Sequence, residues 1–449
     1  MKTGAINYSI KAQKGLRFDA SFHLSEGLMV KRQIASSPYD MLTIKDVTSE
    51  IFYGNRAKRV YVTKRENGIP FLSSSDILQA DLDNVKLASK KYTPCIEQMT
   101  LQKGWTLISR SGTIGNCAFA NAKHAQKLAS EHVIRLVPNN ILRGGLVYAY
   151  LASNHGHSLL TQGTFGAVIQ HIEPNFIASL PIPKFPYEFQ KEVDDLIQES
   201  ARLREEAADA LNEAINLFES EIGSSKVNLG YNTKSIKSSS ISARFCRFDS
   251  QFQIGKAQIT KYPNMIKIGN VAAKIFVGNR GKRYYVNNGI PFLSSSDMML
   301  ANPLRYCKYI SKNTPSLSDM IVNNRDILIS RSGTVGNTII VGNTLSGVAV
   351  SEHAMRLVID SSIMSPEYVF AYFMTKHGHD ALQVLPYGSV IVTLGEDFLA
   401  DVDLPIIDKS KMDSIIQFVS NYIEKQDKSV EFENLAISKV ETEIEKWNN

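Results

Sequence analysis

Hydrophobic and polar residues follow two patterns along the chain, and each pattern occurs twice. Short apolar runs such as 59–63, 105–109 and 133–137 are separated by turns rich in Gly, Asn and Ser, which is typical of β-strands. Longer apolar stretches at 144–154 and 366–376 predict helices that follow the strands. We therefore predict globular domains of mixed α/β (α+β) class, without predicting the order of their strands.

After Pro186 the apolar residues recur at spacings of three and four. The segment 188–222 contains neither Gly nor Pro. Its repeating positions are Val193, Leu196, Ser200, Leu203, Ala207, Ala210, Ala214 and Leu217. In 410–447 they are Met412, Ile416, Val419, Ile423, Gln426, Val430, Glu433, Ile437, Val440, Ile444 and Trp447. These positions predict the seam of a coiled coil; an amphipathic helix packed on its own domain is the alternative.

The chain is a tandem duplication. GIPFLSSSD at 68–76 recurs unchanged at 289–297, and ISRSGTIGN at 108–116 recurs as ISRSGTVGN at 329–337. Further matches, in the same order, are IFYGNRAKRVYV with IFVGNRGKRYYV, SEHVIRLV with SEHAMRLV, the two HGH triplets, FGAVI with YGSVI, and RFDASF with RFDSQF. The offset stays between 220 and 230 residues. The repeat is too long for a solenoid unit, so it predicts two copies of one domain.

These patterns predict four regions. Residues 1–186 and 223–408 form the two copies, the second including a Gly/Ser/Lys-rich connection at 223–243, and residues 187–222 and 409–449 form long helices. At about 1.5 Å per residue the helices would be roughly 50 and 57 Å long. If they pair, chain direction makes them antiparallel, so that direct repeats in sequence become an inverted, pseudo-two-fold pair in space.

Composition excludes several classes of protein. Lys and Arg exceed Asp and Glu by only 50 to 44, a balance that permits nucleic-acid binding without requiring it. None of the four cysteines belongs to a C-x-x-C pair, which argues against a zinc ribbon and a secreted disulfide framework. There is no apolar leader and no apolar run long enough to span a membrane, so we expect a cytoplasmic protein.

The strongest candidate for a nucleic-acid contact is a basic segment at 54–65 that contains no acidic residue and recurs at 278–286. Basic side chains neutralise phosphates, and Arg can also donate two hydrogen bonds to guanine. A solvated hairpin is the alternative. The Ser-rich block at 73–76 could contact phosphates, or cytosine through Asp76, or cap a helix.

The SRSGTIG segment could form a tight turn at Gly112 and Gly115 whose amides hold a phosphate beside Arg110, or a purely structural turn. FGAVI at 165–169 and its counterpart are weaker candidates of the same kind. The predicted DNA contacts are the polar, charged and aromatic residues Asn55, Arg56, Lys58, Arg59, Tyr61, Ser74, Ser75, Arg110, Ser111, Thr113, Asn279, Arg280, Lys282, Arg283, Tyr285, Ser295, Ser296, Arg331, Ser332 and Thr334.

No motif for catalysis or nucleotide binding is present. The chain has no G-x-x-x-x-G-K-[ST], no G-x-S-x-G and no N-P-P-Y-type tetrapeptide. Histidines occur in SEH and HGH, but His171 has no histidine counterpart in the second copy. We therefore expect packed or helix-end histidines and no metal site.

Taken together, the RFDA opening, the IPFLSSSD and ISRSGTIG blocks, the LPIP segment and the terminal helix resemble type I restriction–modification specificity subunits. The resemblance covers nearly the whole chain, twice. It implies two target recognition domains separated by an antiparallel coiled coil, and a non-catalytic chain without cofactors that reads a split site in double-stranded DNA. Two modification subunits would carry S-adenosylmethionine, and restriction subunits that use ATP and magnesium can join them.

An enzyme with an unrecognised site and a scaffold that does not bind DNA are the alternatives. Methyl transfer by the pure chain would favour the first alternative, and absence of salt-dependent DNA binding would favour the second. Because the two copies are so alike, we expect two similar, inverted half-sites. The unlike loops 77–104 and 298–325 could instead do the reading.

Overall fold

A computed structural model describes residues 26–56, 58–162, 171–223, 225, 227, 247, 249–259, 261–388 and 392–448 of the chain. The chain divides into two compact units, Met1–Glu205 with Lys428–Asn449, and Glu206–Asp427. Both unit boundaries fall inside the long helices, so each unit contains one half of each helix. The four-region division made from the sequence stays a prediction.

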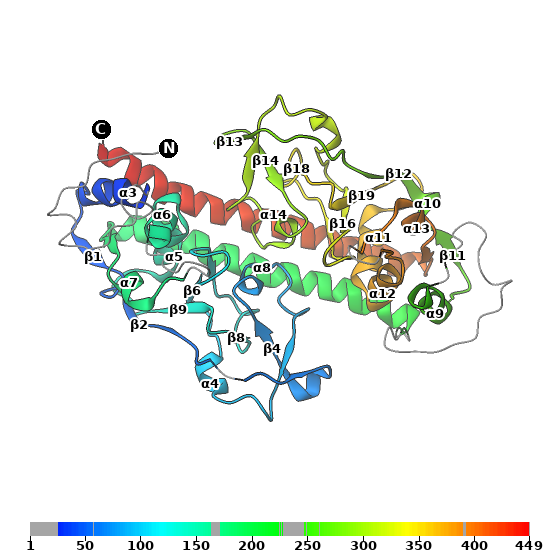
Figure 1. Ribbon diagram of the computed structural model, residues 1–449, viewed down its shortest axis with the longest axis horizontal. Helices are drawn as coiled ribbons and strands as arrows, with labels where there is room; N and C mark the ends of the chain where they lie inside the picture. Colours follow the sequence, from blue (N-terminus) through cyan, green and yellow to red (C-terminus); the bar gives the residue numbers. More distant parts are fainter. Residues whose placement is uncertain are drawn as a thin grey trace. The chain divides into compact units, whose positions relative to one another are not determined.

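The first unit combines short strands with helices, as the sequence predicts. Its strands are β1 (Met41–Thr43), β2 (Thr48–Tyr53), β3 (Tyr61–Val62), β4 (Gly68–Leu72), β5 (Leu87–Ser89), β6 (Thr106–Ser109), β7 (Cys117–Phe119), β8 (Leu128–Ala129), β9 (Val133–Pro138) and β10 (Pro181–Pro183). Its helices are α3 (Glu26–Ala35), α4 (Ile96–Met99), α5 (Gly144–Ala152), α6 (Asn154–Gln162), α7 (Pro174–Ala178) and the first part of α8 (Tyr187–Ile222). Figure 1 labels several of these elements, among them β2, β4, β6, β9, α5 and α8.

The second unit repeats this plan. Its strands are β11 (Met265–Lys267), β12 (Ala272–Val277), β13 (Tyr285–Val286), β14 (Ile290–Leu293), β15 (Lys308–Ile310), β16 (Ile327–Ser330), β17 (Thr338–Ile340), β18 (Ala349–Val350), β19 (Ala354–Ile359) and β20 (Asp403–Pro405). Its helices are α9 (Ser250–Gln258), α10 (Ile268–Val271), α11 (Pro366–Met374), α12 (Lys376–Val384), α13 (Glu396–Ala400) and the first part of α14 (Lys409–Glu445).

The strand order, which the sequence did not predict, is the same in both units. In the first unit one sheet has the order β2-β9-β6-β7, a second has the order β3-β5-β4-β8, and β1 pairs with β10. In the second unit the orders are β12-β19-β16-β17 and β13-β15-β14-β18, and β11 pairs with β20. Even the register irregularity in β2, between Thr48 and Glu50, recurs in β12 between Ala272 and Lys274. The duplication seen in sequence is therefore a duplication of topology.

The core of each unit includes residues from both long helices. In the first unit Val193 and Ile197 of α8 and Ile437 and Val440 of α14 are buried in one cluster with the strands and α5. In the second unit the α8 contribution is Ala214, Phe218 and Ile222, and the α14 contribution is Ile415, Val419 and Ile423. Since burial of apolar surface is the main stabilising term in folding, neither core is complete without both helices.

The two helices run antiparallel within each unit. In the first unit Lys439 pairs with Glu192 at 2.7 Å, and the Ser200 hydroxyl donates to the Ser429 carbonyl at 2.7 Å. In the second unit Glu206 pairs with Lys425, and Lys411 lies 3.9 Å from Glu221. Residue numbers rise along α8 as they fall along α14, so the predicted antiparallel pairing is confirmed.

The predicted seam needs three corrections. Ile197 is buried where the spacing predicted Leu196, Phe218 where it predicted Leu217, and Ile415 where it predicted Ile416. Phe218 stacks on Tyr368 of α11 at 4.9 Å between ring centroids. At these positions the globular core, and not the helix pair alone, decides which side is buried. The alternative of a helix packed on its own domain therefore holds together with the coiled-coil prediction.

Two repeated blocks lie wholly or partly outside the described residues. RFDASF at 17–22 and FGAVI at 165–169 lie outside them, as do parts of 223–243 and of the counterparts RFDSQF and YGSVI. No helix among the described residues is long and apolar enough to cross a membrane.

Candidate functional site

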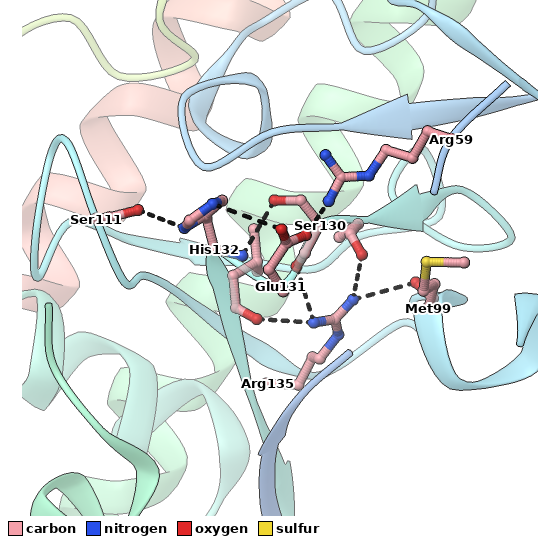
Figure 2. Close-up of polar contacts among 9 residues, drawn as sticks. Arg59, Met99, Ser111, Ser130, Glu131, His132 and Arg135 are labelled. Carbon is pink, nitrogen blue, oxygen red and sulfur yellow. Dashed lines mark hydrogen bonds and ion pairs between the residues drawn. The ribbon is translucent and has the colours of Figure 1, made fainter. Parts of the chain in front are cut away.

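Three repeated segments meet in the first unit, and the backbone brings them together (Figure 2). They are the end of the basic segment at Arg59, the SRSG loop after β6, and the SEH segment before β9. The Arg110 amide donates to the His132 carbonyl at 2.9 Å, and the Ser130 amide donates to the Leu72 carbonyl at 3.0 Å. The SEH segment thus joins the loop after β6 to the end of β4, where the Ser-rich block begins.

An arginine–glutamate pair occupies the middle of this site. Arg59 forms an ion pair with Glu131, and its guanidinium carbon lies 4.7 Å from the centre of the Phe71 ring. The Arg59 side chain is 23% exposed and the Glu131 side chain only 10%. One face of the guanidinium is therefore covered by the ring, and the ion pair fixes its direction.

A serine–histidine pair lies next to it. The Ser111 hydroxyl oxygen and His132 Nδ1 are 2.7 Å apart. Burial, together with the positive charges of Arg110 and Arg59, lowers the pKa of His132 below its ordinary value. A neutral imidazole at pH 7 can accept from the serine hydroxyl and donate with its other nitrogen.

A fully buried arginine supports the site from below. Arg135 is 0% exposed, and it donates to the carbonyl oxygens of Ala129 and Val133 at 2.7 Å, of Ser130 at 3.2 Å and of Met99 at 3.3 Å. These bonds bend the chain around the guanidinium and present Glu131 and His132 on the other side (Figure 2). Burial lowers the pKa of Arg135 to about 10, so the side chain is still charged at neutral pH.

The second unit contains the same arrangement. Arg283 pairs with Glu352 and lies 4.7 Å from the Phe292 ring, and the Ser332 hydroxyl is 2.7 Å from His353 Nδ1. Arg356 is 2% exposed and donates to the Ile321 carbonyl at 2.7 Å. The site is therefore a property of the repeated domain.

Glu131, His132 and Arg135 are not among the residues predicted as contacts. The sequence indicated the SEH repeat only as a candidate for metal binding. Arg135 lies in the segment 133–137, which the sequence predicts to be a strand. The available signal was an arginine within an apolar strand that recurs in the second copy, because a buried arginine needs a dedicated set of acceptors.

The exposed basic residues remain the strongest predicted contacts. Arg56, Lys58 and Lys282 are exposed, and no carboxylate among the described residues pairs with any of them. Arg280 is 87% exposed and lies 3.6 Å from Glu352. Asn55 donates to the side chain of Gln98, and Asn279 donates to Ser316 at 3.4 Å.

The tyrosines of the basic segment are exposed. Tyr61 is 44% exposed and Tyr285 is 53% exposed. Each has a lysine ammonium over its ring, Lys86 at 5.3 Å and Lys308 at 5.5 Å. The pairing of an aromatic face with a cation recurs in both copies.

The first and last residues of the Ser-rich block form the hydrogen bonds of a helix cap, which is one of the alternatives that the sequence left open. Ser73 Oγ accepts from the Asp76 amide at 3.3 Å, and Asp76 accepts from the Ser73 amide at 2.8 Å. This reciprocal arrangement is a capping box, and it recurs at Ser294 and Asp297. The serines predicted as contacts lie between these ends: Ser74 and Ser295 are partly buried, and Ser75 and Ser296 are exposed.

The SRSG segment forms the predicted tight turn. Gly112 and Gly115 have φ of 79° and 82°, which only glycine adopts without strain, and their counterparts Gly333 and Gly336 do likewise. Thr113 and Thr334 are exposed at the tip. Arg110 is paired with Glu173, whereas the Nε of Arg331 donates to the Leu394 carbonyl at 3.1 Å. DNA contacts by all these residues stay predictions.

The histidines of the HGH triplets are packed at helix starts. His155 and His377 are the second residues of α6 and α12, and both are buried. Among the described residues no group of three or more His, Cys, Asp or Glu side chains could hold a metal ion.

Comparison of the chain with models of known protein families finds one matching family. Residues 37–205 match the model of the type I restriction modification DNA specificity domain. No curated protein sequence matches the chain.

Two solved structures align over nearly the whole chain. One is the type I restriction-modification system S subunit from M. genitalium, with 12% identity, a TM-score of 0.35, and coverage of 91% of this chain and 96% of that one. The other is the HsdS subunit from Thermoanaerobacter tengcongensis, with 13% identity, a TM-score of 0.30, and coverage of 90% and 96%. At these scores the two structures add nothing to the family match.

Proposed function

We propose that the chain reads a two-part DNA site, one half with each copy, because residues 37–205 match the model of the type I restriction modification DNA specificity domain. The description of this family is DNA specificity, and we propose that the chain supplies recognition and no catalysis. The family model covers the first copy; the proposal extends the same role to the second.

The observation that carries the proposal is the repetition of the site. The ion pair of Arg59 with Glu131 and the hydrogen bond of Ser111 with His132 both recur, with Arg283, Glu352, Ser332 and His353 as the counterparts. A domain that reads DNA once is expected to read it again when its site residues and their contacts are duplicated.

The charges around the site support binding to duplex DNA. Arg56, Lys58, Arg280 and Lys282 lie exposed beside the fixed Arg59 and Arg283. Exposed cations neutralise phosphates and release counterions, which gives affinity without sequence preference.

The partners follow from the same proposal. Two modification subunits, which carry S-adenosylmethionine, bind the chain and methylate DNA at the site that it reads. Restriction subunits that use ATP and magnesium join this complex. The chain itself contributes sequence recognition.

The methylome of the source strain tests this function. We expect a two-part methylated motif that disappears when the gene is deleted and returns when the gene is restored. Alanine substitution of Arg56, Lys58, Arg59, Arg280, Lys282 and Arg283 together should abolish the motif, while the folded protein persists as judged by circular dichroism.

Two results would contradict the proposal. Methyl transfer by the pure chain would favour an enzyme with an unrecognised site. An unchanged methylome after deletion, together with no salt-dependent DNA binding by the chain and its copurifying partners, would favour a scaffold.

A further inference from the structure

The two copies differ around one matched arginine. The arginine after β6 is Arg110 in the first copy and Arg331 in the second, and its backbone is held in the same way in both. The Arg110 amide donates to the His132 carbonyl at 2.9 Å, and the Arg331 amide donates to the His353 carbonyl at 2.8 Å. The glycine that follows Ser111 or Ser332 has φ of 79° or 77°.

In the first copy Arg110 is held on two sides. Its guanidinium carbon lies 4.4 Å from the centre of the Tyr53 ring, and its Nη2 pairs with the carboxylate of Glu173. Only 14% of the Arg110 side chain is exposed. Stacking and ion pairing both hold the guanidinium where it is, and the carboxylate occupies its outer donors.

In the second copy both of these neighbours are missing. Tyr53 is the last residue of β2, and Val277 is the last residue of β12. Glu173 precedes α7, and Gly395 precedes α13 at the corresponding position. Arg331 keeps one hydrogen bond, from Nε to the Leu394 carbonyl, and no carboxylate among the described residues pairs with it.

The rest of the site does not vary in this way. The ion pair of Arg59, its Phe71 ring and the Ser111–His132 hydrogen bond all have direct counterparts in the second copy. The contacts of Arg59 and of the Ser111–His132 pair are therefore duplicated, whereas the partners of Arg110 are not.

We infer that Arg331 donates to DNA in the second copy, whereas Tyr53 and Glu173 withhold Arg110 from DNA in the first. This inference rests on the proposed function. The two halves of the recognised site are consequently unequal, because one copy offers a guanidinium that the other retains. The acceptor is a phosphate oxygen or the O6 and N7 pair of a guanine, since both accept from an arginine fork.

Electrostatics supports this difference. For Arg110 to reach DNA, its ion pair must break and leave the Glu173 carboxylate near a chain of phosphates, and like charges repel. To reach DNA, Arg331 would break only a hydrogen bond to the uncharged Leu394 carbonyl. The substitutions Tyr53→Val and Glu173→Gly give the first copy the residues that the second copy has at these positions. They should free the Arg110 side chain to contact DNA.

The test uses the full-length chain, purified from its source strain with the subunits that accompany it. A pool of random-sequence DNA duplexes is selected on this protein, and the enriched duplex is used for equilibrium binding across a salt titration. Four proteins are compared: Arg331→Ala, Arg110→Ala, the release variant Y53V/E173G, and the release variant carrying Arg110→Ala. Thermal unfolding confirms that each is folded.

We expect Arg331→Ala to weaken binding more than Arg110→Ala does, because Arg110→Ala removes no contact with DNA and acts only through the Glu173 carboxylate that it leaves unpaired. In the release variant, which lacks Glu173, Arg110→Ala should weaken binding because a contact with DNA is lost. If the acceptor is a base, the loss is about fivefold or more and one position of the selected motif relaxes. If it is a phosphate, the salt slope falls by about 0.9 and no base preference changes.

Equal losses from Arg110→Ala and Arg331→Ala in the unreleased protein would overturn the inference. So would a release variant in which Arg110→Ala has no effect on binding. If the unsubstituted protein enriches no duplex and shows no salt-dependent binding, the proposed function itself is refuted, and this inference falls with it.

Discussion

At the residue scale, the buried arginines show how the site keeps its shape. Arg135 donates to four carbonyl oxygens, whereas Arg356, at the same place in the second copy, donates to one. Nε has no partner in either arginine, and in Arg356 Nη2 has none either. A buried carbonyl that loses its donor costs about 1–3 kcal/mol.

We therefore predict that Arg135→Met destabilises the chain by roughly 2–5 kcal/mol, since several acceptors lose their partner at once. The matched variant Arg356→Met should cost less, because fewer hydrogen bonds are lost. Urea unfolding followed by circular dichroism measures both. Equal losses of unfolding free energy in the two variants would show that the number of hydrogen bonds made by the arginine does not determine the loss.

A second residue-scale prediction concerns His124, which is buried and donates from Nε2 to the Ile77 carbonyl at 3.0 Å. Burial lowers its pKa to about 4 from an ordinary value of 6.5. As pH falls, the unfolded chain takes up this proton first. The stability contribution is therefore complete above pH 6.5 and is lost between about pH 6.5 and 4, by roughly 3 kcal/mol.

The second copy has Leu345 at the position of His124. The variant His124→Leu should therefore lose less stability than the unsubstituted chain over the same pH interval. Thermal unfolding at a series of pH values measures the difference between the two curves, in which the carboxylates common to both proteins cancel. If the two curves of stability against pH are parallel, His124 is not the source of the pH dependence.

At the scale of elements, the part of the helix pair that belongs to the first unit contains a buried polar network. Glu433 of α14 is 2% exposed, accepts from Tyr148 of α5, and pairs with Arg204 of α8 at 2.8 Å. The corresponding positions in the second unit are Leu211, Phe370 and Gln426. Buried polar groups of this kind can specify the register of paired helices, and only the first unit contains this one.

Glu433→Gln should destabilise the first unit by about 3–5 kcal/mol, because Arg204 is left as a buried charge without its carboxylate. Lys425→Met, which removes the more exposed pair with Glu206, should cost no more than about 1 kcal/mol. Hydrogen exchange in 428–445 and in 206–222 assigns each loss to its part of the helices. Equal protection in the two variants would contradict a special role for Glu433.

At the scale of the whole molecule, we predict that the helix pair sets the distance between the two half-sites. Removing one heptad from both α8 and α14 shortens each helix by about 10 Å. The unread spacer in the methylated motif should shorten by about three base pairs, at 3.4 Å each. Removing seven residues from the predicted connection at 223–243 is the control and should change nothing. An unchanged spacer after the heptad deletion would show that the helices do not set the distance between the half-sites.

The duplication also predicts the form of the target. GIPFLSSSD is identical in both copies, and residues 51–62 differ from residues 275–286 only at Tyr53/Val277, Ala57/Gly281 and Val60/Tyr284. We expect two similar half-sites in inverted orientation, unequal at few positions. Two unrelated half-sites in the methylome would instead assign the reading to the unlike loops 77–104 and 298–325.

The sequence alone determined the features that depend on local pattern. Heptad spacing predicted helices at 188–222 and 410–447, and the structure has them at Tyr187–Ile222 and Lys409–Glu445. Glycine spacing predicted the SRSG turn, because positive φ is a property of single residues. Internal repetition predicted two copies of one domain, since equal sequences form equal folds.

Only the tertiary structure decided which side chains meet. The pairing of Arg59 with Glu131 joins residues 72 positions apart in the chain, and the pairing of Arg110 with Glu173 joins residues 63 apart. No local pattern encodes such partners, because they depend on the order of the strands in the sheet. The same order turned Arg135 inward and left Arg56 and Lys58 exposed. Identical motifs in the two copies could therefore differ in which arginine is held and which is left to bind.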